Sequence, residues 1–411
     1  MALYVQKFGG TSVGDPDRIR EVADHVARCR RRGDEVVLVV SAMGKETDEL
    51  LLLAEQVSTS KPGREMDMLI TGGERKACAL VSMALHDRGI ESASFTGSQA
   101  GFKTDTSHRN AKILDVNPYR IRDALDAGKV PVVGGSQGVS TDNDVTFFGR
   151  GGSDTTAVAL AHALGADACE LYTDVPGVFT TDPRLVPDAR KMDHISFDEL
   201  LEMTATGCPK PAMRSVELAR SYGVTLHVRS AFSWVPGTWV TEEASMERAI
   251  ISAITHDTSE AKMTVSGVSD RPGVAALLFR RLADAEVNVD MIVQNVSAEG
   301  RTDISFTLPH EQVQVAEDAV TSITDQLGAD AVIADGDIAR VSLIGAGMQT
   351  NPGVAATMFE TLSGHDINIE MISTSAIRIS CVVREAQAED AVAALHAAYE
   401  LHKAPEDRID V

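Results

Sequence analysis

The sequence has few aromatic residues and a shortage of basic charge, and the charge excludes two classes of partner. Phenylalanine, tryptophan and tyrosine make up 4% of the 411 residues, and 38 lysines and arginines stand against 60 aspartates and glutamates. The resulting net charge of −22 repels the phosphate backbone of nucleic acids and the anionic headgroups of lipids. We therefore expect neither a nucleic acid nor a membrane as a partner.

Cysteine is also scarce, and long apolar runs are missing. The five cysteines are scattered singly, without a CxxC pair or a histidine at ligand spacing, which argues against a disulfide framework and a zinc site. No apolar run approaches the roughly 18 residues that span a bilayer, and the N-terminus begins with a short apolar strand rather than a basic leader. We expect a cytoplasmic protein without a cluster of metal ligands.

Aliphatic side chains are plentiful, and the chain is long. Hydrophobic residues make up 44% of the sequence and charged residues 24%, a composition typical of α/β enzymes. A length of 411 residues predicts two to four domains.

In the first 230 residues, β-rich runs alternate with amphipathic stretches, which predicts βαβ units and a largely parallel sheet. The expected strands are 2–6, 35–41, 130–133, 146–148, 170–172 and 225–228, and the expected helices are 17–31, 48–57, 71–88, 118–127 and 154–164. Ligands of such folds bind at the carboxyl ends of the strands.

The remainder of the chain contains an internal repeat. The sequence PGVAA at 272–276 recurs at 352–356, and NVDMI at 288–292 recurs as NIEMI at 368–372, so both matches share an offset of 80 residues. Each copy predicts a helix with apolar positions four residues apart, followed by strands near 302–308 and 377–383. This arrangement is typical of a ferredoxin-like βαββαβ unit.

Three glycine-rich loops follow predicted strands and lead into helices: 7–12 (KFGGTS), 41–44 (SAMG) and 149–154 (GRGGSD). Glycine lets backbone amides approach an anion, and a helix N-terminus adds partial positive charge, which is how polyphosphates are held. The GxxxxGK[ST] pattern of P-loop enzymes is missing. We expect the three loops to share one sheet edge and to form a phosphate site.

These loops, together with 71–74 (TGGE), 95–101 (FTGSQAG) and 173–184 (TDVPGVFTTDPR), resemble the motif series of the aspartate kinases of the amino acid kinase superfamily. The repeated unit resembles their tandem ACT domains, and the similarity is greatest to the actinobacterial type regulated by lysine and threonine. The resemblance implies an α/β protein: an amino acid kinase domain at 1–245, with a mainly parallel sheet between helix layers, followed by two ferredoxin-like βαββαβ ACT domains at 262–337 and 338–411.

The resemblance also implies an activity: transfer of the γ-phosphoryl group of ATP, with Mg²⁺, to the side-chain carboxylate of L-aspartate. The product would be 4-phospho-L-aspartate, the first intermediate toward diaminopimelate, lysine, threonine and methionine. A carboxylate with an ordinary pKa of about 3.9 is already ionised at neutral pH, so the reaction needs no general base. It needs positive charge and positioning, because the nucleophile and the polyphosphate repel each other.

By the same resemblance, Lys7, Glu74 and Asp154 are the catalytic residues. Lys7 would face the γ-phosphate, Glu74 would accept the substrate ammonium group, and Asp154 would orient Lys7. We expect Glu74 close to the start of a helix that begins near Thr71. The guanidinium fork of Arg150, between two glycines, suits the α-carboxylate. The other implied substrate contacts are Ser41, Thr47, Gly151, Gly152 and Ser153.

The nucleotide contacts implied by the resemblance come from several motifs. They are Lys7, Phe8, Gly9, Gly10, Thr173, Asp174, Phe179, Asp182, Arg184 and Lys210. Lys210 stands one place later than the lysine of the family, between two prolines that restrict its backbone. We expect phosphates and water to hold Mg²⁺, so no dedicated protein ligands are predicted.

The ACT domains imply lysine and/or threonine as effectors. The implied allosteric residues are Asp270, Gly273, Ala275, Gln294, Met348, Thr350, Val354 and Asn368. Pairing of ACT domains implies an oligomer, either a dimer or an α2β2 assembly with a small subunit started near Met246. Ala376 replaces a glutamate that is usual in relatives, which bears on inhibition by lysine.

Two other functions remain open. One is a kinase for a related acidic amino acid such as glutamate or acetylglutamate, although such kinases lack tandem ACT units. The other is a non-catalytic amino-acid sensor with a decayed kinase domain, against which the intact Lys7, Glu74, Arg150 and Asp154 argue.

Overall fold

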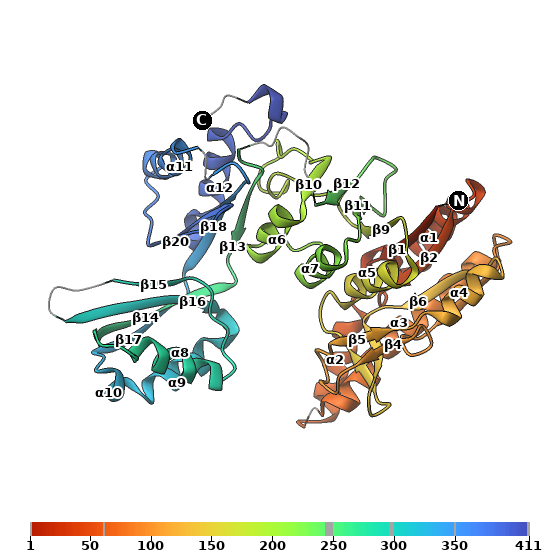
Figure 1. Cartoon of the computed structure of the whole chain (residues 1–411), viewed down its shortest axis with the longest axis horizontal. Coiled ribbons are helices and arrows are strands. Elements are labelled where there is room, and N and C mark those ends of the chain that lie inside the picture. Colours follow the sequence, from red (N-terminus) through yellow and green to blue (C-terminus); the bar gives the residue numbers. More distant parts are fainter. Residues whose placement is uncertain (1, 61, 243–249, 296–299, 349–350, 409–411) are drawn as a thin grey trace. The chain divides into compact units, whose positions relative to one another are not determined.

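A computed structural model of the chain describes residues 2–60, 62–242, 250–295, 300–348 and 351–408. These residues form two compact units (Figure 1), and each unit is considered by itself. The first consists of Met1–Val178, Lys191–Thr204 and Pro209–Met246, and the second of Phe179–Arg190, Ala205–Cys208 and Glu247–Val411. Two short segments from the middle of the sequence thus belong to the second unit. The domain boundaries at 245, 262 and 338 stay a prediction.

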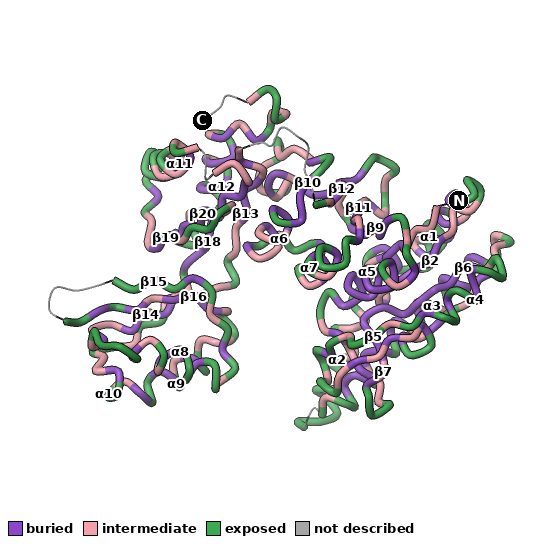
Figure 2. The backbone as a smooth tube through the Cα atoms, in the orientation of Figure 1, coloured by how far each residue is buried: buried purple, intermediate pink, exposed green. Residues whose placement is uncertain are grey.

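An eight-stranded sheet forms the core of the first unit. Its strand order is β10 (His194–Ser196), β12 (Thr238–Thr241), β11 (Leu226–Ser230), β9 (Ala168–Thr173), β1 (Leu3–Phe8), β2 (Glu35–Val40), β6 (Val130–Gly134) and β3 (Ser92–Phe95). β11 and β12 pair antiparallel, whereas the other neighbours pair in parallel. The central strands are buried along most of their length (Figure 2), as expected for a parallel sheet covered on both faces.

Helices cover both faces of this sheet. Those of the first unit are α1 (Pro16–Arg31), α2 (Glu46–Val57), α3 (Gly63–His86), α4 (Tyr119–Asp126), α5 (Gly152–Leu164), α6 (Phe197–Ala205) and α7 (Met213–Tyr222). Apolar residues of α1 and α3 pack with Val36, Leu38 and Val40 of β2 in one core. Because side chains alternate along a strand, α5, which contacts β1, β2 and β9, lies on the other face.

A second sheet of the first unit carries the third glycine loop. Its order is β5 (Ile113–Val116), β4 (Phe102–Thr104), β7 (Gln137–Ser140) and β8 (Val145–Phe147). β7 and β8 form an antiparallel hairpin, turned at Asn143 with a φ of 67°. The loop at 149–151 therefore follows a strand of this smaller sheet, and the expectation that all three loops follow strands of one sheet is wrong.

The predicted helix at 71–88 begins earlier than expected. α3 starts at Gly63 and ends at His86, so the glycines of TGGE lie inside a helix rather than in a turn. A Cβ atom at Gly73 would come within 2.8 Å of Ala42 Cβ. Glycine at this position therefore allows the loop after β2 to approach the helix.

The second unit contains the two repeats, each with a four-stranded antiparallel sheet. The orders are β15 (Ile292–Gln294), β16 (Arg301–Pro309), β14 (Glu260–Ser269), β17 (Ala331–Asp335), and β19 (Met371–Thr374), β20 (Arg378–Arg384), β18 (Ile338–Ile344), β13 (Ala253–Asp257). The first repeat carries α8 (Val274–Asp284), α9 (Val313–Thr321) and α10 (Thr324–Leu327), and the second α11 (Gly353–Gly364) and α12 (Ala388–Ala398). The predicted apolar positions of α8 and α11 are buried in the two cores.

The second repeat differs from the first in its fourth strand. β17 follows α9 and α10 and pairs with β14 in the first repeat. In the second repeat, β13 pairs with β18 in the equivalent place, although β13 precedes both repeats in the sequence. The prediction that each ACT domain is a continuous βαββαβ unit therefore needs correction for the second copy.

Segments from the middle of the chain are held in the second unit by hydrogen bonds. The Ile254 N–H donates to the Thr180 carbonyl at 2.8 Å, and the Thr180 hydroxyl lies 3.0 Å from His396 Nε2. The Thr206 hydroxyl lies 2.6 Å from that of Thr255. β13 therefore contacts both segments. In the described part of the chain, no helix is long and apolar enough to cross a membrane.

Candidate active site

The carboxyl ends of β1 and β2 meet the N-terminus of α5 around Lys7. Lys7 Nζ lies 2.7 Å from Asp154 Oδ1, and the two side chains are 11% and 9% exposed. A Cβ atom at Gly9 would lie 3.3 Å from Lys7 Nζ, so glycine leaves room beside the ammonium group. The predicted neighbours Lys7 and Asp154 are thus in direct contact at the sheet edge.

Asp154 does not cap α5, because Gly151 takes that position with a φ of 73°. The second carboxylate oxygen of Asp154 accepts the Ala212 N–H at 3.2 Å. A Cβ atom at Gly151 would lie 2.4 Å from Ala212 Cβ, so the loop requires glycine for both its backbone angle and this close approach. The backbone at Ala212, which no sequence pattern pointed to, therefore helps to fix Asp154.

Three serine hydroxyls connect the loops around this pair. The Ser41 hydroxyl donates to Ser153 Oγ at 2.9 Å, and Ser136 Oγ lies 3.0 Å from the same atom. The Ser136 N–H donates to Thr156 Oγ1 at 2.9 Å. Ser136 and Thr156 were not predicted; the available signal was the glycine pair that precedes Ser136 after a buried strand.

Glu74 lies in the interior of α3, so its predicted position near a helix start is wrong. The residue is 3% exposed, and the Ala42 N–H donates to its carboxylate. Burial raises the pKa of Glu74 to about 7. Its Oε2 atom is buried without a hydrogen-bond partner among the described residues. A buried carboxylate oxygen without a partner is well suited to accept an ammonium group.

The structure does not bring Arg150 against the other predicted substrate residues. Its side chain is 94% exposed, and its guanidinium lies 3.9 Å from the Asp48 carboxylate. Thr47 lies in the first turn of α2 and is half-buried. Gly152 begins α5 beside Ser136. A Cβ atom at Gly152 would lie 2.9 Å from the Ser136 Oγ atom.

The predicted nucleotide residues fall into both units. In the first, Lys210 Nζ lies 3.0 Å from Asp174 Oδ1, and the Thr173 hydroxyl donates to the Val175 carbonyl at 3.0 Å. Gly10 opens a 3-10 turn after β1. The Phe8 ring is buried in the core shared with α1, so only its backbone is at the strand end.

Phe179, Asp182 and Arg184 belong to the second unit. The Arg184 guanidinium lies 2.6 Å from the Asp182 carboxylate and lowers its pKa. The Arg184 N–H also donates to Asp182 at 2.9 Å, so Asp182 organises a local turn.

Donor groups at the end of β1 are suited to a polyphosphate. Within residues 2–60, 62–242, 250–295, 300–348 and 351–408, no group of three or more His, Cys, Asp or Glu side chains is placed to hold a metal ion. Ser12, in the turn after Gly10, has a buried hydroxyl without a hydrogen-bond partner in the described structure. The Lys7 ammonium lies at the end of β1 and this hydroxyl in the turn after it, an arrangement suited to a phosphate group.

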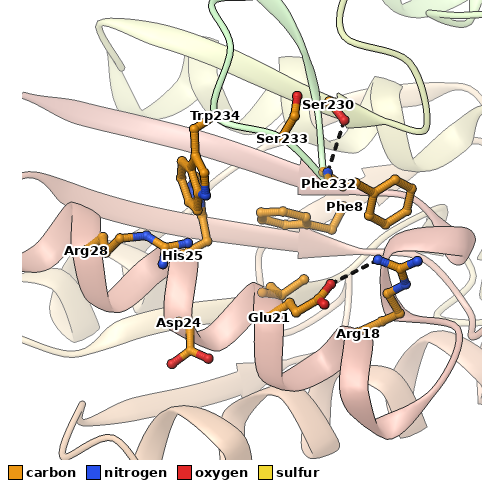
Figure 3. Close-up of a pocket in the computed structure, with 12 residues that line it drawn as sticks. Phe8, Arg18, Glu21, Asp24, His25, Arg28, Ser230, Phe232, Ser233 and Trp234 are labelled. Carbon is orange, nitrogen blue, oxygen red and sulfur yellow. Dashed lines mark hydrogen bonds and ion pairs between the residues drawn. The ribbon is translucent and has the colours of Figure 1, made fainter.

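A separate pocket of about 280 Å³ lies beside α1 (Figure 3). The Arg18 guanidinium stacks 4.0 Å from the Phe232 ring centre, and that of Arg28 stacks 3.6 Å from the Trp234 ring. His25 also stacks on the Trp234 ring. Phe8 lines this pocket, and because neighbouring side chains of β1 alternate, the pocket opens on the face opposite Lys7.

The predicted effector residues lie on the two repeats. Gly273 caps α8 with a φ of 97°, and the Asp270 N–H donates to the Gly300 carbonyl at 2.8 Å. Val354 is buried in the second core, and Met348 packs against it. Ala275 lies on α8 and Gln294 on β15. Asn368 lies in the segment just before β19. Thr350 and Met246 lie outside the described residues.

Comparison with known proteins identifies relatives over the whole chain. The amino acid kinase family profile matches residues 2–230, and an ACT domain profile matches 263–323 and 341–399. The aspartokinase of Mycolicibacterium smegmatis is 53% identical over 407 residues, covering 98% of this chain and 97% of that protein. The aspartokinase of Corynebacterium glutamicum is 51% identical with the same coverage.

Solved structures of more distant relatives share the fold. Crystal structures of E. coli aspartokinase III, one in complex with aspartate and ADP and one with lysine and aspartate, each match 96% of this chain and 99% of the crystallised chain. Their TM-scores are 0.81 and 0.73, at 24% identity. With amino acid kinase and ACT profiles in the expected order, and more than half of the residues identical to actinobacterial relatives along nearly their whole length, the chain belongs to the aspartokinase family of amino acid kinases.

Proposed function

We propose that this chain transfers the γ-phosphoryl group of ATP to the side-chain carboxylate of L-aspartate. The observation that carries the proposal is the buried Lys7–Asp154 ion pair at the strand ends, beside glycine loops and within the fold of an amino acid kinase. The names of the relatives support a kinase over a sensor that has lost activity. The aspartate and ADP in the E. coli structure support the choice of substrates.

The reaction needs positive charge more than proton transfer. A carboxylate oxygen of aspartate attacks the γ-phosphorus, the bond from that phosphorus to the β,γ-bridging oxygen breaks, and ADP leaves with the bonding electrons. No proton has to move, because the aspartate side chain is ionised at neutral pH. Lys7 stabilises the charge on the transferring group, and Asp154 holds the lysine ammonium in place.

The substrate amino acid is bound through its charged groups. Glu74 accepts the ammonium group with its unpartnered oxygen, and Arg150 swings from solvent to the α-carboxylate as a bidentate donor. Ser41, Thr47 and the 151–153 backbone complete the site. Thr173, Asp174 and Lys210 contact ATP, whereas Phe179, Asp182 and Arg184 stay nucleotide contacts expected from the resemblance to the family. Mg²⁺, held by the phosphates and water, would neutralise part of the phosphate charge.

An ATP-dependent assay with hydroxylamine, which traps acyl phosphates, tests this function. We expect hydroxamate formation with L-aspartate and none with L-glutamate or acetylglutamate. Lys7→Gln should lower kcat by about 10²- to 10³-fold, the usual effect of losing one charge-stabilising group. Lys76→Gln, which removes an exposed partner of Glu46, serves as the control with unchanged turnover. Absence of turnover by the wild-type chain with all three acceptors contradicts the proposal.

We further propose that lysine and/or threonine inhibit the enzyme through the repeats, at sites that include Asp270, Gly273, Ala275, Gln294, Met348, Thr350, Val354 and Asn368. The ACT profile match and the lysine in the E. coli structure support this. On this proposal the enzyme is a cytoplasmic oligomer that begins the synthesis of diaminopimelate, lysine, threonine and methionine. Titration of the hydroxamate assay with each amino acid, singly and together, tests the regulation; unchanged activity opposes it.

A further inference from the structure

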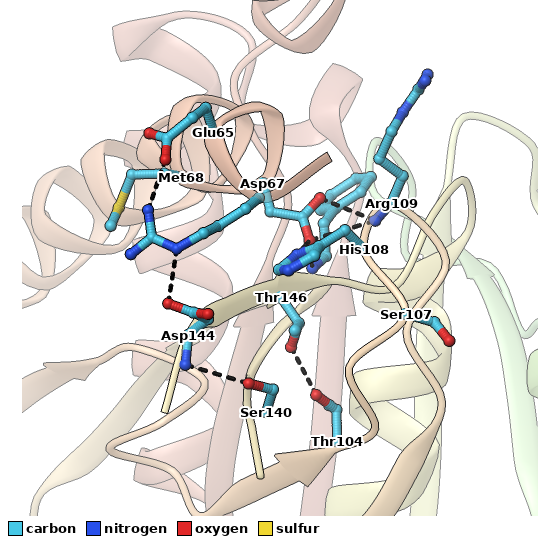
Figure 4. A network of polar contacts seen from close by, with 12 residues as sticks. Glu65, Asp67, Met68, Thr104, Ser107, His108, Arg109, Ser140, Asp144 and Thr146 are labelled. Atoms are coloured by element: carbon cyan, nitrogen blue, oxygen red, sulfur yellow. Dashed lines mark hydrogen bonds and ion pairs between the residues drawn. The ribbon is translucent and has the colours of Figure 1, made fainter. Parts of the chain in front are cut away.

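Asp67 is a buried carboxylate held by donors from the 108–109 loop (Figure 4) and from the end of β8. It lies in α3, has no exposed surface, and does not belong to any motif selected from the sequence. Its Oδ2 atom lies 2.9 Å from His108 Nδ1 and accepts the Phe147 N–H at 3.1 Å. Its Oδ1 atom accepts the Arg109 N–H at 2.9 Å, and the same N–H lies 3.2 Å from Oδ2. Both oxygens of the carboxylate are therefore used.

The two segments that Asp67 joins also contact each other. The Ala111 N–H donates to the Phe147 carbonyl at 2.9 Å. A Cβ atom at Gly149 would lie 3.3 Å from the Arg109 carbonyl oxygen. The Arg214 guanidinium donates to the carbonyls of Ala111 at 2.8 Å and Phe148 at 2.9 Å. The backbone that leads into the glycine loop is thus fixed at its base, with Asp67 as its attachment to α3.

Glu74 is attached to the same helix. Residues seven apart lie on one face of a helix, and Asp67 and Glu74 are separated by that spacing. α3 therefore carries the carboxylate proposed for the substrate ammonium group and also fixes the base of the loop that carries Arg150.

We propose that Asp67 is a positioning residue that sets the glycine loop of Arg150 at the distance from Glu74 that one aspartate molecule requires. The inference rests on the proposed function. On this proposal, Asp67 touches neither substrate and acts through the 147–151 backbone.

Asparagine at this position tests the idea with little change in shape. An amide has one acceptor oxygen and one donor nitrogen, whereas Asp67 faces two backbone N–H groups on its two oxygens. In either orientation of the amide, its NH₂ group meets the Phe147 or the Arg109 N–H. The amide therefore loses the Phe147 attachment in one orientation and weakens the Arg109 attachment in the other, where the N–H keeps only its 3.2 Å acceptor, and neither case opens a cavity.

A matched control is available on the same two elements. Arg64 on α3 forms an exposed ion pair with Asp144 at 2.8 Å, which also joins α3 to the β7–β8 hairpin (Figure 4). This pair lies before β8, whereas the Asp67 contacts lie at the end of β8 that leads into the glycine loop. Asp144→Asn makes the same chemical change in solvent.

The experiment measures kcat, the two KM values and the melting temperature for wild type, Asp67→Asn and Asp144→Asn. We expect Asp67→Asn to raise the KM for L-aspartate about tenfold or more, as misplaced binding groups do. The kcat and the KM for ATP should stay within about twofold, and Asp144→Asn should leave all three within that range. A fall in kcat with both KM values unchanged would assign Asp67 a structural role and overturn the proposal.

One further variant, at His108, tests the proposal independently. His108→Ala removes one of the three donors while keeping both backbone bonds; we expect the KM for aspartate to rise by about threefold, and this variant decides the matter if Asp67→Asn does not fold. An unchanged KM in the folded variant overturns the proposal. Failure of the proposed function is recognised separately, because the wild-type chain would then not turn over aspartate.

Discussion

Burial raises the pKa of Glu74 above the usual range of a glutamate. The raised pKa makes the neutral form favourable for stability, although substrate binding needs the ionised form. In the unfolded chain the pKa is near the ordinary value of 4.5, whereas in the folded chain it is about 7. Between these values the folded chain binds more protons than the unfolded chain, so the free energy of unfolding falls as pH rises through this window, by about 3 kcal/mol in total. The ionised form, however, is the one that accepts an ammonium group.

We therefore expect Glu74→Gln to stabilise the substrate-free protein at pH 8 and to weaken aspartate binding. The glutamine is neutral at every pH, so the variant should lose the fall in melting temperature between pH 5 and 7.5. In the wild type, the KM for aspartate should rise as pH drops below 7. Thermal melting and steady-state kinetics across this range measure both effects. Glu65→Gln, an exposed position on the same helix, is the control; a wild-type KM that is constant from pH 6 to 8 would refute the expectation.

At the scale of elements, a buried polar network joins the central strands on the face opposite Lys7. Glu170 on β9 accepts hydrogen bonds from Gln6 on β1 at 2.7 Å and from Arg229 on β11 at 2.9 Å. Burial by itself raises the pKa of Glu170, but the neighbouring His227 ring, the hydrogen bonds from Arg229 and Gln6 and the charge of Arg229 outweigh it and lower the pKa to about 2. The network therefore fixes β1 and, with it, the strand end that carries Lys7.

Arg229→Ala should lower the free energy of unfolding of the first unit by about 3–5 kcal/mol, because it leaves the Glu170 charge buried without its main partner. Urea denaturation followed by circular dichroism measures the effect. Arg220→Ala removes a solvent-exposed pair with Asp198 and should cost at most about 1 kcal/mol. Equal effects of the two substitutions would show that the network contributes nothing beyond a surface ion pair.

The elements also show what sequence patterns can predict. Strands such as β2 and β9 were predicted to within a few residues, because continuous apolar runs bounded by turn residues specify buried strands. The start of α3 was missed, because Gly72 and Gly73 suggested a turn. Gly73 instead allows close packing of the helix against Ala42. β13 was missed as a member of the second repeat, because strand partners distant in sequence leave no local signal.

The site was predicted in the same uneven way. The Lys7–Asp154 contact was expected from the family motifs, and the structure contains it. Ser136, Thr156 and Asp67 were not selected, because a buried polar residue is recognised by its partners, which only the folded chain brings together. Arg150 is exposed, so its proposed role depends on a movement that neither sequence nor geometry specifies.

At the scale of the whole molecule, one buried arginine connects both repeats. Arg340 on β18 is 1% exposed, and its guanidinium contacts the carboxylates of Asp257, Glu260 at 3.0 Å, and Asp290. It also donates to the Ala205 carbonyl at 2.9 Å. Residues of the first repeat, the second repeat and the 205–208 segment thus share a single cation.

Arg340→Ala should destabilise the second unit by about 3–5 kcal/mol, since it leaves several partly buried carboxylates without a counter-charge. Arg384→Ala is the control, because that side chain is 45% exposed where it pairs with Asp335 and Glu370, and we expect a clearly smaller loss. Chemical denaturation of the full chain measures both. If Arg340→Ala lowered the free energy of unfolding less than Arg384→Ala, the buried arginine would not have the stabilising role assigned to it.

The two segments held against β13 have a consequence for any chain divided near Met246. Residues 247–411 alone lack 179–190 and 205–208, so the Thr180 and Thr206 partners of β13 would have to come from another polypeptide. A fragment that ends before Met246 carries both segments and can supply them. Separately made halves should therefore recognise each other by fragment complementation, as two pieces of one interrupted fold.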